Sequence, residues 1–437
     1  MGEPWERHYE QKVMSAEDAV RAFAPSGSKV FIGGLDVARH TLEALLQRVL
    51  AGEVEGIELH GNMTNGDLGL DRLAVPEGRF RYRSFFNGAN ERAGMRAGSA
   101  TYVPLHLSNT ERYLASVRPD VAIVPMTPPD EHGRCNIGPL GFTPAGLRHA
   151  RAIVAQINPC LPAVNGTTHD YHVSELAAVV EHAEPLAPVA PAACAPEELK
   201  IAEHIVDRVR DGACIQLGIG GLANAVGQGL RSKRHLGVHS EMFPDVMAEL
   251  QREGVIDNSR KTYLPGVSVA GFAAGTPQLH AFIERNPAVI FEPYERVNDF
   301  DMIRANDDMV SVNSAIAVDL TGQVCAESFG SRQYSGTGGQ VDYVRGAAAS
   351  KGGMSFVALT SRARTSAGPV SKIVPTLAPG SVVTTLRTDV HLVCTEYGCV
   401  DLRFCDIPTR AKRLISIAHP DVRDELACEA RALGLLY

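Results

Sequence analysis

One glutamate in this chain has neighbours that could make it reactive. Glu241 lies in the segment 236–242 (Leu-Gly-Val-His-Ser-Glu-Met), which follows the glycine turn Gly218-Ile219-Gly220-Gly221. A carboxylate can attack an electrophilic carbon, and the backbone N–H groups of a glycine turn can hold a phosphate or an oxyanion. The run Gly336-Thr337-Gly338-Gly339 offers further donors of this kind and is our first candidate for an oxyanion hole. These residue types predict a reaction centre made of an acid and glycine loops.

His239 and Ser240 stand beside Glu241 and suggest a hydrolase triad. We reject that interpretation, because consecutive residues of a strand point to opposite faces and cannot converge on one atom. The sequence also lacks a Gly-x-Ser-x-Gly motif. The run 128–133 (Pro-Pro-Asp-Glu-His-Gly) contains candidate metal ligands, but its prolines favour a rigid turn. We therefore expect no metal site.

A nicotinamide oxidoreductase is an alternative from another class. Gly218 to Ala223 fits the Gly-x-Gly-x-x-Ala pattern of dinucleotide-binding folds, and Glu241 lies where a ribose-binding acid would follow. Such a short pattern is common by chance, and several segments described below have no explanation in that fold. Absence of bound NAD and of hydride transfer would separate the two interpretations.

The elements that would position these residues recur in both halves of the chain. Val30-Phe31-Ile32 leads into Gly33-Gly34, and a helical apolar face follows at positions 42, 45, 46 and 49. Residues 213–217 lead in the same way into the turn at Gly218, and apolar positions 222, 226 and 230 mark another helix. Strand, glycine turn and helix thus occur twice, which predicts two tandem related α/β domains with the active site in the cleft between them.

Prolines predict where the domains join. Pro185, Pro188, Pro191 and Pro196 stand among alanines and are typical of a linker. We expect an N-terminal domain over 1–190 and a C-terminal domain over 191–437 that carries Glu241. A helix over 202–209 should follow the linker and stop at Gly212. Further strands, apolar and without clean alternation as in sheets covered on both faces, are expected at 121–124, 153–157, 288–291, 309–312, 316–320, 356–359, 382–385 and 390–393.

Composition narrows the class of protein. The net charge is −8 and no polybasic run occurs, so we expect no nucleic-acid partner. No apolar stretch is long enough to span a membrane, and the acidic start is unlike a signal peptide. The nine cysteines are scattered without metal-binding spacing, and we interpret them as buried, reduced residues of a cytoplasmic protein.

Several further segments, taken in order, resemble one enzyme family. They are Asp120–Val124 with 128–133, Asn158-Pro159, Asn313–Ile316 with Leu320–Val324, Gln333–Asp342, Val382–Val393, Thr395–Gly398 and Ile417–Pro420. Together with the glycine turn and the Glu241 segment, this set resembles the family I coenzyme A transferases. It is most similar to the acetyl-CoA hydrolase/transferase group, which includes 4-hydroxybutyrate and butyrate:acetate CoA-transferases. The resemblance runs from about residue 20 to the end of the chain.

The resemblance implies a reaction and a set of contacts. It implies CoA transfer from an acyl-CoA to a small carboxylic acid, by ping-pong through a glutamyl-CoA thioester on Glu241. It implies a homodimer with coenzyme A or acyl-CoA as substrate and no tightly bound cofactor. Gln216 is a second catalytic candidate that could hydrogen-bond the thioester or carboxylate, although a satisfied strand polar group is an equal alternative. The expected coenzyme A contacts are Gly218, Ile219, Gly220, Gly221, Leu222, Ile316, Gly338, Gly339 and Lys372, of which Lys372 could equally be a solvated charge.

The chain departs from the family pattern at a few positions. Ala223 replaces the proline that the family usually has after the glycine turn. Where the family favours Ser-Asp-Gly after the nucleophile, this chain has Phe243-Pro244-Asp245-Val246. The departing residues there are Phe243, Pro244 and Val246. These three residues could reshape the acyl pocket. The acyl donor and acceptor therefore stay open, and an acyl-CoA hydrolase on the same fold is the nearest alternative.

Overall fold

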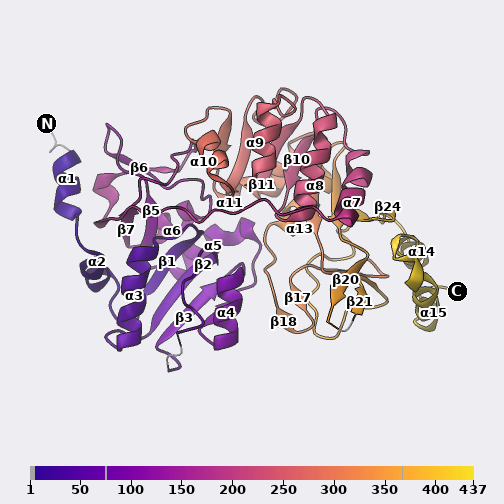
Figure 1. Cartoon of the computed structure of the whole chain (residues 1–437), viewed down its shortest axis with the longest axis horizontal. Coiled ribbons are helices and arrows are strands. Elements are labelled where there is room, and N and C mark those ends of the chain that lie inside the picture. The colour runs from indigo at the N-terminus through magenta and orange to yellow at the C-terminus, as the bar shows by residue number, and fades with distance from the viewer. Residues whose placement is uncertain (1–4, 74–75, 367) are drawn as a thin grey trace. The chain divides into compact units, whose positions relative to one another are not determined.

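The chain forms two compact α/β units (Figure 1). The computed structural model describes residues 5–73, 76–366 and 368–437. One unit holds the chain up to Val189 together with Ala270–Arg296, and the other holds Ala190–Val269 with Val297–Tyr437. Each unit has its own parallel sheet. The expectation of two tandem α/β domains is therefore confirmed.

The first unit is built on a parallel sheet in the order β4-β3-β2-β1-β5-β7-β9. Its strands are β1 (Lys29–Leu35), β2 (Ile57–Thr64), β3 (Phe80–Ser84), β4 (Ala100–Tyr102), β5 (Val121–Met126), β7 (Ala152–Ile157) and β9 (Ala178–Glu181). Its helices include α1 (Trp5–Lys12), α2 (Ala16–Phe23), α3 (Arg39–Ala51), α4 (Ala89–Ala97), α5 (Thr110–Val117), α6 (Thr143–His149) and α10 (Pro277–Ile283). β6 (Arg134–Asn136) and β8 (Asp170–His172) form a separate antiparallel pair.

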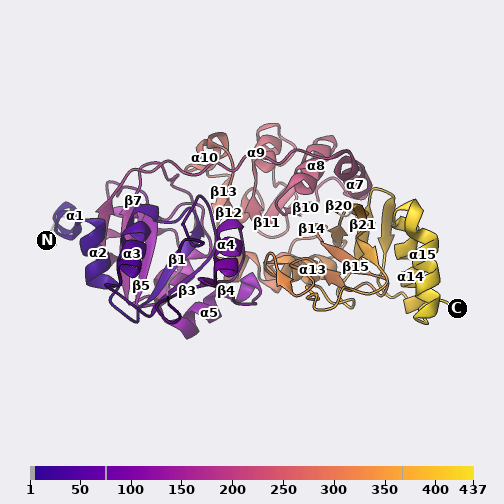
Figure 2. The ribbon, with the colours of Figure 1, turned by 60° about the horizontal axis from the view of Figure 1, so that its bottom comes forward.

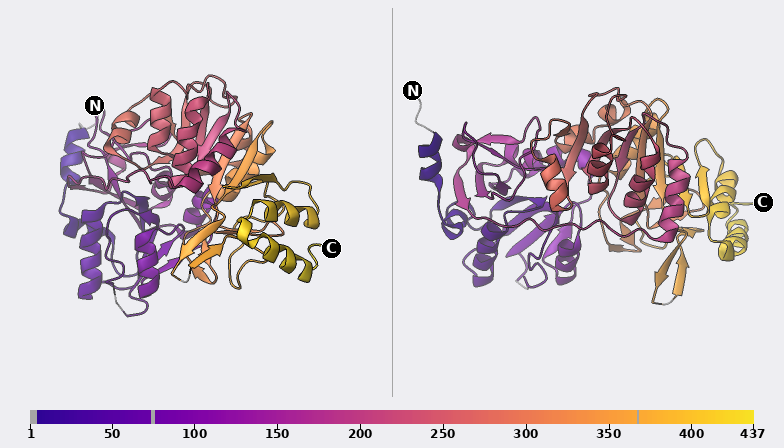
Figure 3. Two further views of the ribbon diagram at one scale, coloured as in Figure 1. Left: turned by 45° about the vertical axis from the view of Figure 1, so that its right-hand side comes forward. Right: turned by 45° about the horizontal axis from the view of Figure 1, so that its top comes forward.

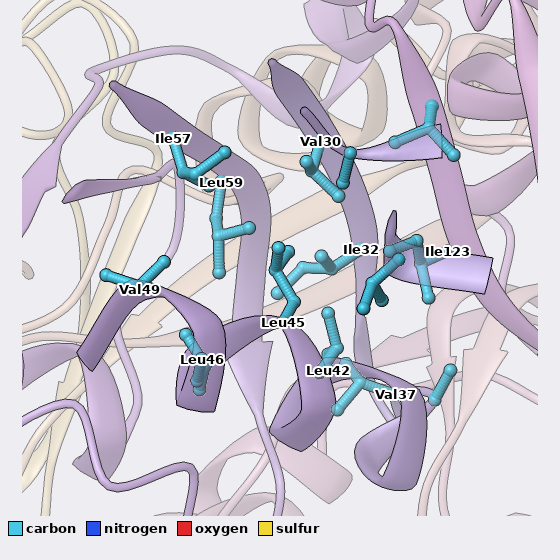
Figure 4. Close-up of a cluster of buried hydrophobic side chains, with 14 of the residues drawn as sticks. Val30, Ile32, Val37, Leu42, Leu45, Leu46, Val49, Ile57, Leu59 and Ile123 are labelled. Atoms are coloured by element: carbon cyan, nitrogen blue, oxygen red, sulfur yellow. The ribbon is translucent and has the colours of Figure 1, made fainter. Parts of the chain in front are cut away.

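The core of this unit forms where α3 packs on the sheet (Figure 4). Leu42, Leu45 and Val49 lie on one face of α3 because they follow the helical repeat, and all three are buried. They face Ile32 of β1 and Leu59 of β2 (Figure 4). The helical spacing seen in the sequence is therefore the spacing of the core.

The second unit repeats the arrangement around β10. Its described pairings give the order β11-β10-β14-β19-β23-β24, parallel except for the last pair. The strands are β10 (Cys214–Leu217), β11 (Gly237–Phe243), β14 (Met309–Ser314), β19 (Met354–Ala358), β23 (Leu392–Thr395) and β24 (Gly398–Asp401). In each unit the strand before the glycine turn lies between the next strand of the chain and a later one. β1 lies between β2 and β5, and β10 lies between β11 and β14. Ligands of doubly wound sheets bind at such a reversal of strand order.

Helices and small sheets complete the second unit. Its helices are α7 (Pro196–Val206), α8 (Gly221–Gly229), α9 (Asp245–Arg252), α12 (Phe300–Arg304), α13 (Gln340–Ala349), α14 (Ile407–Ile417) and α15 (Arg423–Ala432). α14 and α15 lie side by side (Figure 2 and Figure 3) and bury an apolar cluster against β23 and the small strands β15 (Ala317–Asp319), β16 (Val324–Cys325) and β22 (Ile373–Val374). Two hairpins, β17–β18 (Ser328–Phe329, Arg332–Gln333) and β20–β21 (Arg362–Thr365, Gly368–Ser371), extend from this region. β12 (Ser268–Ala273) and α11 (Tyr294–Val297) lie at the crossings between the units in sequence, and β13 (Val289–Phe291) lies between these two crossings.

Three expectations were wrong in detail. Residues 382–385 form no strand, and only an isolated bridge joins Thr385 to Val324, because the chain leaves Pro379-Gly380 as a loop with Val382 exposed. α7 ends at Val206, so the predicted helix over 202–209 stops earlier than Gly212. The cysteines are not all reduced and buried. Cys394 and Cys399 form a disulfide because the β23–β24 hairpin places them opposite each other, and Cys160 and Cys428 are exposed.

No helix within the described ranges is both long and apolar enough to cross a membrane. The stretch 182–195, which contains most of the predicted linker, has neither helix nor strand.

Candidate active site

Glu241 lies near the end of β11, a buried strand of the second unit. β11 pairs in parallel with β10, the strand that precedes the glycine turn. Successive side chains of a strand alternate between faces, so His239 and Glu241 share one face and Ser240 points to the other. Ser240 Oγ donates to the carbonyl of Leu217 at 3.4 Å. This geometry agrees with our rejection of a triad built from the three adjacent residues.

Two groups from distant parts of the chain hold the Glu241 carboxylate. The amide Nδ2 of Asn298 donates to Oε2 at 2.7 Å, and the backbone N–H of Gly339 donates to the same carboxylate. Gly339 must be glycine, because a Cβ there would overlap both Oε2 of Glu241 and Nδ2 of Asn298. The second glycine run therefore lies directly against Glu241, where a backbone donor can reach an oxyanion that forms next to the carboxylate.

A second acid approaches the same amide. Asp342 lies in the first turn of α13, and its Oδ2 is 3.4 Å from Nδ2 of Asn298. Because a carboxylate can only accept, the nitrogen of the Asn298 carboxamide must face both acids. Gly339 precedes Gln340, the first residue of α13, so the positive end of the helix dipole also faces this site.

Burial sets the protonation of Glu241. The pKa of this carboxyl is raised from 4.5 to about 7 as the net result of several causes. Burial is the largest and raises the pKa, the Asn298 hydrogen bond lowers it, the nearby charge of Asp342 raises it, and the Gly339 hydrogen bond lowers it. A carboxyl with a pKa near 7 is substantially ionised at neutral pH. Perturbed titratable groups with a specific charge partner are typical of functional sites.

The first glycine turn caps α8. Gly220 has φ +101° and Ile219 is exposed, whereas Leu222 is buried in the unit's core. Gly221 begins the helix, and a Cβ on it would lie 2.5 Å from Oε2 of Glu198. A turn of this kind at the N-terminus of a nine-residue helix presents free N–H groups and favours an anion.

Glu198 links this turn to Lys372. Glu198 accepts a hydrogen bond from the N–H of Ala195 at 2.8 Å and its charge, like that of Glu396, acts on Lys372. Burial lowers the pKa of Lys372 to about 8, and the two carboxylates raise it. Lys372 is half-buried, and its contact with coenzyme A stays a prediction. Glu396 is itself fixed by Ser361, whose N–H and Oγ donate to it at 2.8 and 2.5 Å.

The remaining candidates lie elsewhere in the unit. Gln216 is buried in β10, and its Oε1 accepts from the N–H of Val312 at 3.1 Å and from Asn313 Nδ2 at 3.4 Å. The Gln216 side-chain oxygen thus accepts hydrogen bonds from the neighbouring strand β14, as expected for a satisfied polar group of a strand. A catalytic role for Gln216 stays a prediction. Ile316 lies on the bend between β14 and β15, where its N–H donates to the carbonyl of Cys325. Gly338 has φ +60° and precedes Gly339 directly.

Two residues that follow Glu241 belong to the core. Phe243 and Val246 are buried, and a Cβ on Gly227 of α8 would lie 2.6 Å from Val246 Cγ1. Val246 therefore packs α9 against α8.

Sequence reasoning missed three polar residues of this site: Asn298, Asp342 and Glu198. Asn298 and Glu241 are 57 residues apart, and an asparagine between two short helices has no pattern that marks it. Asp342 belonged to a quoted motif but carried no role. Glu198 stands in a run of acids at the start of α7 that reads as an ordinary helix N-terminus.

Two family models match the chain. The acetyl-CoA hydrolase/transferase N-terminal domain matches residues 3–191, and the C-terminal domain of the same family matches residues 275–430. Glu241 lies between the two matched stretches.

Full-length relatives span the gap. The chain is 38% identical over 433 residues to succinyl-CoA:cyclohexane-1-carboxylate CoA transferase of Geobacter metallireducens, covering 98% of this chain and 97% of that protein. It is 36% identical to 4-hydroxybutyrate coenzyme A transferase of Clostridium kluyveri, covering 97% and 98%. Acetyl-CoA hydrolase of Saccharomyces cerevisiae is more distant, at 29% identity over 47% of this chain and 38% of that protein.

Solved structures agree with these relatives. RipA from Yersinia pestis superposes with a TM-score of 0.93 at 34% identity, covering 99% of this chain and all of that one. The 4-hydroxybutyrate CoA-transferase from Porphyromonas gingivalis superposes with a TM-score of 0.81 at 31% identity, covering 98% of this chain and all of that one. The full-length relatives leave no room for the nicotinamide oxidoreductase interpretation, and the chain belongs to the acetyl-CoA hydrolase/transferase family.

Proposed function

We propose that this protein transfers coenzyme A from an acyl-CoA to a small carboxylate, with Glu241 as the covalent nucleophile. The observation that carries the proposal is the Glu241 carboxylate itself, held by Asn298 at 2.7 Å and packed against Gly339 with a pKa of about 7. The two relatives named above that extend over nearly the whole chain are CoA-transferases.

The reaction has four covalent steps. The ionised Glu241 attacks the thioester carbonyl, the C–S bond breaks, and an acyl-glutamyl anhydride forms as CoA thiolate leaves. The thiolate attacks the glutamyl carbonyl, giving a glutamyl-CoA thioester and releasing the first acid as its carboxylate. A second carboxylate attacks this thioester to form a new anhydride, and the thiolate then takes the new acyl group and frees Glu241. Electrons and atoms balance without an external oxidant or reductant.

The surroundings of Glu241 suit these steps. Each attack places negative charge on a carbonyl oxygen, and the Gly339 N–H beside the carboxylate can donate to it. Losing one such donor typically costs about 3 kcal/mol of transition-state stabilisation. The Asn298 amide favours the ionised form of Glu241 and keeps its oxygen oriented.

The glycine turn and Lys372 are the proposed coenzyme A contacts. The turn at Gly218–Leu222 offers N–H groups at the start of α8 for the pyrophosphate. Lys372, kept cationic by Glu198 and Glu396, adds a positive charge near the same turn. A homodimer is proposed from the family resemblance alone, and a cytoplasmic location stays the prediction drawn above from the scattered cysteines.

One experiment tests the nucleophile and the chemistry together. The protein is incubated with acetyl-CoA, butyryl-CoA and succinyl-CoA in turn, first without acceptor, and analysed by intact-protein and peptide mass spectrometry. We expect a CoA adduct on the Glu241 peptide that hydroxylamine cleaves and that Glu241→Ala lacks. Addition of acetate should convert the adduct to acetyl-CoA with ping-pong kinetics. Turnover without any adduct, together with sequential kinetics, would overturn the mechanism.

The same experiment separates the hydrolase alternative, which the yeast relative represents. In a hydrolase, water resolves the adduct and free CoA accumulates whether or not acetate is present. In a transferase, free CoA stays low and new thioester appears in proportion to acetate.

A further inference from the structure

The imidazole of His239 has a defined partner near the reaction centre. His239 lies two residues before Glu241 on β11 and is almost completely buried. Its Nε2 is 2.8 Å from the carbonyl oxygen of Val297. A carbonyl can only accept, so Nε2 carries the proton and donates. Burial, with a smaller contribution from the charge of Lys261, lowers the pKa of His239 to about 3, so the ring is neutral at working pH.

The same carbonyl has a second donor. Tyr343 Oη donates to the Val297 oxygen at 3.0 Å, and a carbonyl oxygen can accept two hydrogen bonds because it has two lone pairs. Tyr343 is buried in α13, the helix that Gly339 precedes, and its ring lies 6.4 Å from that of His239. The Val297 oxygen thus accepts one hydrogen bond from β11, which carries Glu241, and one from α13, whose N-terminus lies beside the Glu241 carboxylate.

The gripped oxygen belongs to the peptide bond that precedes Asn298. The peptide unit is planar and includes the Cα atoms of both residues, so fixing the Val297 oxygen fixes the plane from which the Asn298 side chain leaves. That side chain donates to Glu241 at 2.7 Å. We infer that His239 and Tyr343 are positioning residues that act through the Val297 carbonyl to aim the Asn298 carboxamide at Glu241.

This inference rests on the proposed role of Glu241 and deepens it. It also gives the histidine of the His-Ser-Glu run a function that is neither general base nor triad member. A neutral donor suits the task, because it orients a dipole without adding charge beside a nucleophile. The charged groups that face this cluster are Asp342, which acts on Glu241 from α13, and Lys261, whose Nζ donates to the carbonyls of Val238 and Val267 at 2.8 Å.

The alternative explanation is that the rings of His239 and Tyr343 only contribute to core packing. The two explanations differ in what happens once Asn298 has been removed. If the rings act through Asn298, their polar groups matter only while its carboxamide is present. If the rings support the fold in general, removing their polar groups lowers kcat by the same factor with or without Asn298, and the factors of the single variants multiply in the double variant.

Tyr343→Phe is the sharpest variant, because it removes one hydroxyl and keeps the ring. Tyr263→Phe is its matched control. Tyr263 packs edge to face on the same imidazole, with ring centroids 6.0 Å apart, so this change also removes a hydroxyl from a tyrosine beside His239. His239→Leu removes the other donor, and His239→Gln restores an amide N–H near the position of Nε2. Each change is made in the wild-type and in the Asn298→Ala background.

The first measurement is the rate of butyryl-CoA:acetate exchange as a function of pH. We expect Tyr343→Phe and His239→Leu to lower kcat by about 2- to 10-fold each, the rate equivalent of one neutral hydrogen bond. Their acid limb should move to higher pH, because the Asn298 hydrogen bond lowers the pKa of Glu241. His239→Gln should recover part of the loss, and Tyr263→Phe should change neither quantity.

The decisive comparison is in the Asn298→Ala background. There we expect Tyr343→Phe to have no further effect on kcat or on the acid limb. An equal fold-loss in both backgrounds, or a loss with an unmoved acid limb, would overturn the inference and leave the rings a purely structural role. Tyr343→Phe decides the question even if His239→Leu fails to fold.

A second measurement does not depend on CoA transfer. A carbodiimide reacts with protonated carboxyl groups, and peptide mass spectrometry gives its rate at Glu241 as a function of pH. We expect the midpoint of this curve to move upward in Tyr343→Phe and to stay fixed in Tyr263→Phe. An unmoved midpoint in Tyr343→Phe refutes the positioning role. A shifted midpoint in a protein that forms no CoA adduct supports the positioning role and refutes only the proposed function.

Discussion

Replacing Glu241 by glutamine should stabilise the protein, and the gain should depend on pH. Burial raises the pKa of the folded carboxyl from 4.5 to about 7, so the folded state holds this proton more tightly than the unfolded chain. Between these two pH values the folded state binds more protons, and its stability therefore falls as pH rises. Below pH 4.5 both states are protonated and the penalty vanishes. Above pH 7 the penalty is complete.

The size of the effect follows from the same shift. At about 1.4 kcal/mol for each pH unit, the move from 4.5 to about 7 corresponds to an upper limit of about 3.5 kcal/mol. Glu241 is half-buried, so solvent screens part of this cost, and we expect a gain of about 1–3 kcal/mol at pH 8. Glutamine keeps an oxygen that can accept from Asn298, so the exchange removes the charge and retains a hydrogen bond.

Urea denaturation followed by circular dichroism between pH 4.5 and 8.5 measures the difference. The free energy of unfolding of Glu241→Gln should match wild type at the acid end and exceed it increasingly up to about pH 8. Glu429→Gln, on the exposed surface of α15, is the matched control and should show no such trend. A Glu241→Gln variant as stable as wild type throughout, or less stable at pH 8, would show that the site does not disfavour the charge. A difference that is constant with pH would indicate repacking.

Four further predictions concern activity. Glu241→Ala should lower CoA transfer by more than about a hundredfold, a barrier increase of about 3 kcal/mol, and residual transfer above that level would exclude Glu241 as the nucleophile. Wild-type kcat/KM should rise through about pH 7 as Glu241 ionises, and a rate independent of pH from 5 to 8 would contradict its raised pKa. Gly339→Ala should abolish transfer in a folded protein, because its Cβ displaces Glu241 and Asn298; near-normal kcat would mean that the loop does not approach the carboxylate. Lys372→Met should raise KM for acyl-CoA about tenfold with a smaller change in kcat, and a loss confined to kcat would refute a binding role.

The sequence predicted the elements that local patterns specify. β1 and β10 were visible because apolar runs lead into glycine turns, and α3 because its buried leucines follow the helical repeat. The predicted strand at 382–385 failed because β-branched residues favour a strand only where a partner strand is available. The Cys394–Cys399 disulfide was missed because it depends on the register of the β23–β24 hairpin, and spacing alone does not fix that register.

The site divides along the same line. Glu241 and the two glycine runs could be proposed from the sequence because the chemistry that marks them is local to a few residues. Asn298, Asp342 and Tyr343 come together with Glu241 only after α13 and the segment before α12 pack against β11, and nothing near each of them in sequence predicts that contact. When ordinary residue types from distant parts of the chain meet in a site, a single sequence does not predict the contact.

Two opposing influences act on the pKa of Glu241: burial raises it, and the hydrogen bonds from Asn298 and Gly339 lower it. Burial alone would push the carboxyl toward the neutral form, which is a poor nucleophile, whereas full solvation would leave it ionised but weakly basic. Asn298 and Gly339 offset burial far enough to keep the pKa near 7, so that a large ionised fraction coexists with raised basicity. If Glu241 is the nucleophile, as we propose, the stability lost to its buried charge and the reactivity gained from that charge have one origin. A variant that regains the lost stability, such as Glu241→Gln, must therefore lose the reactivity.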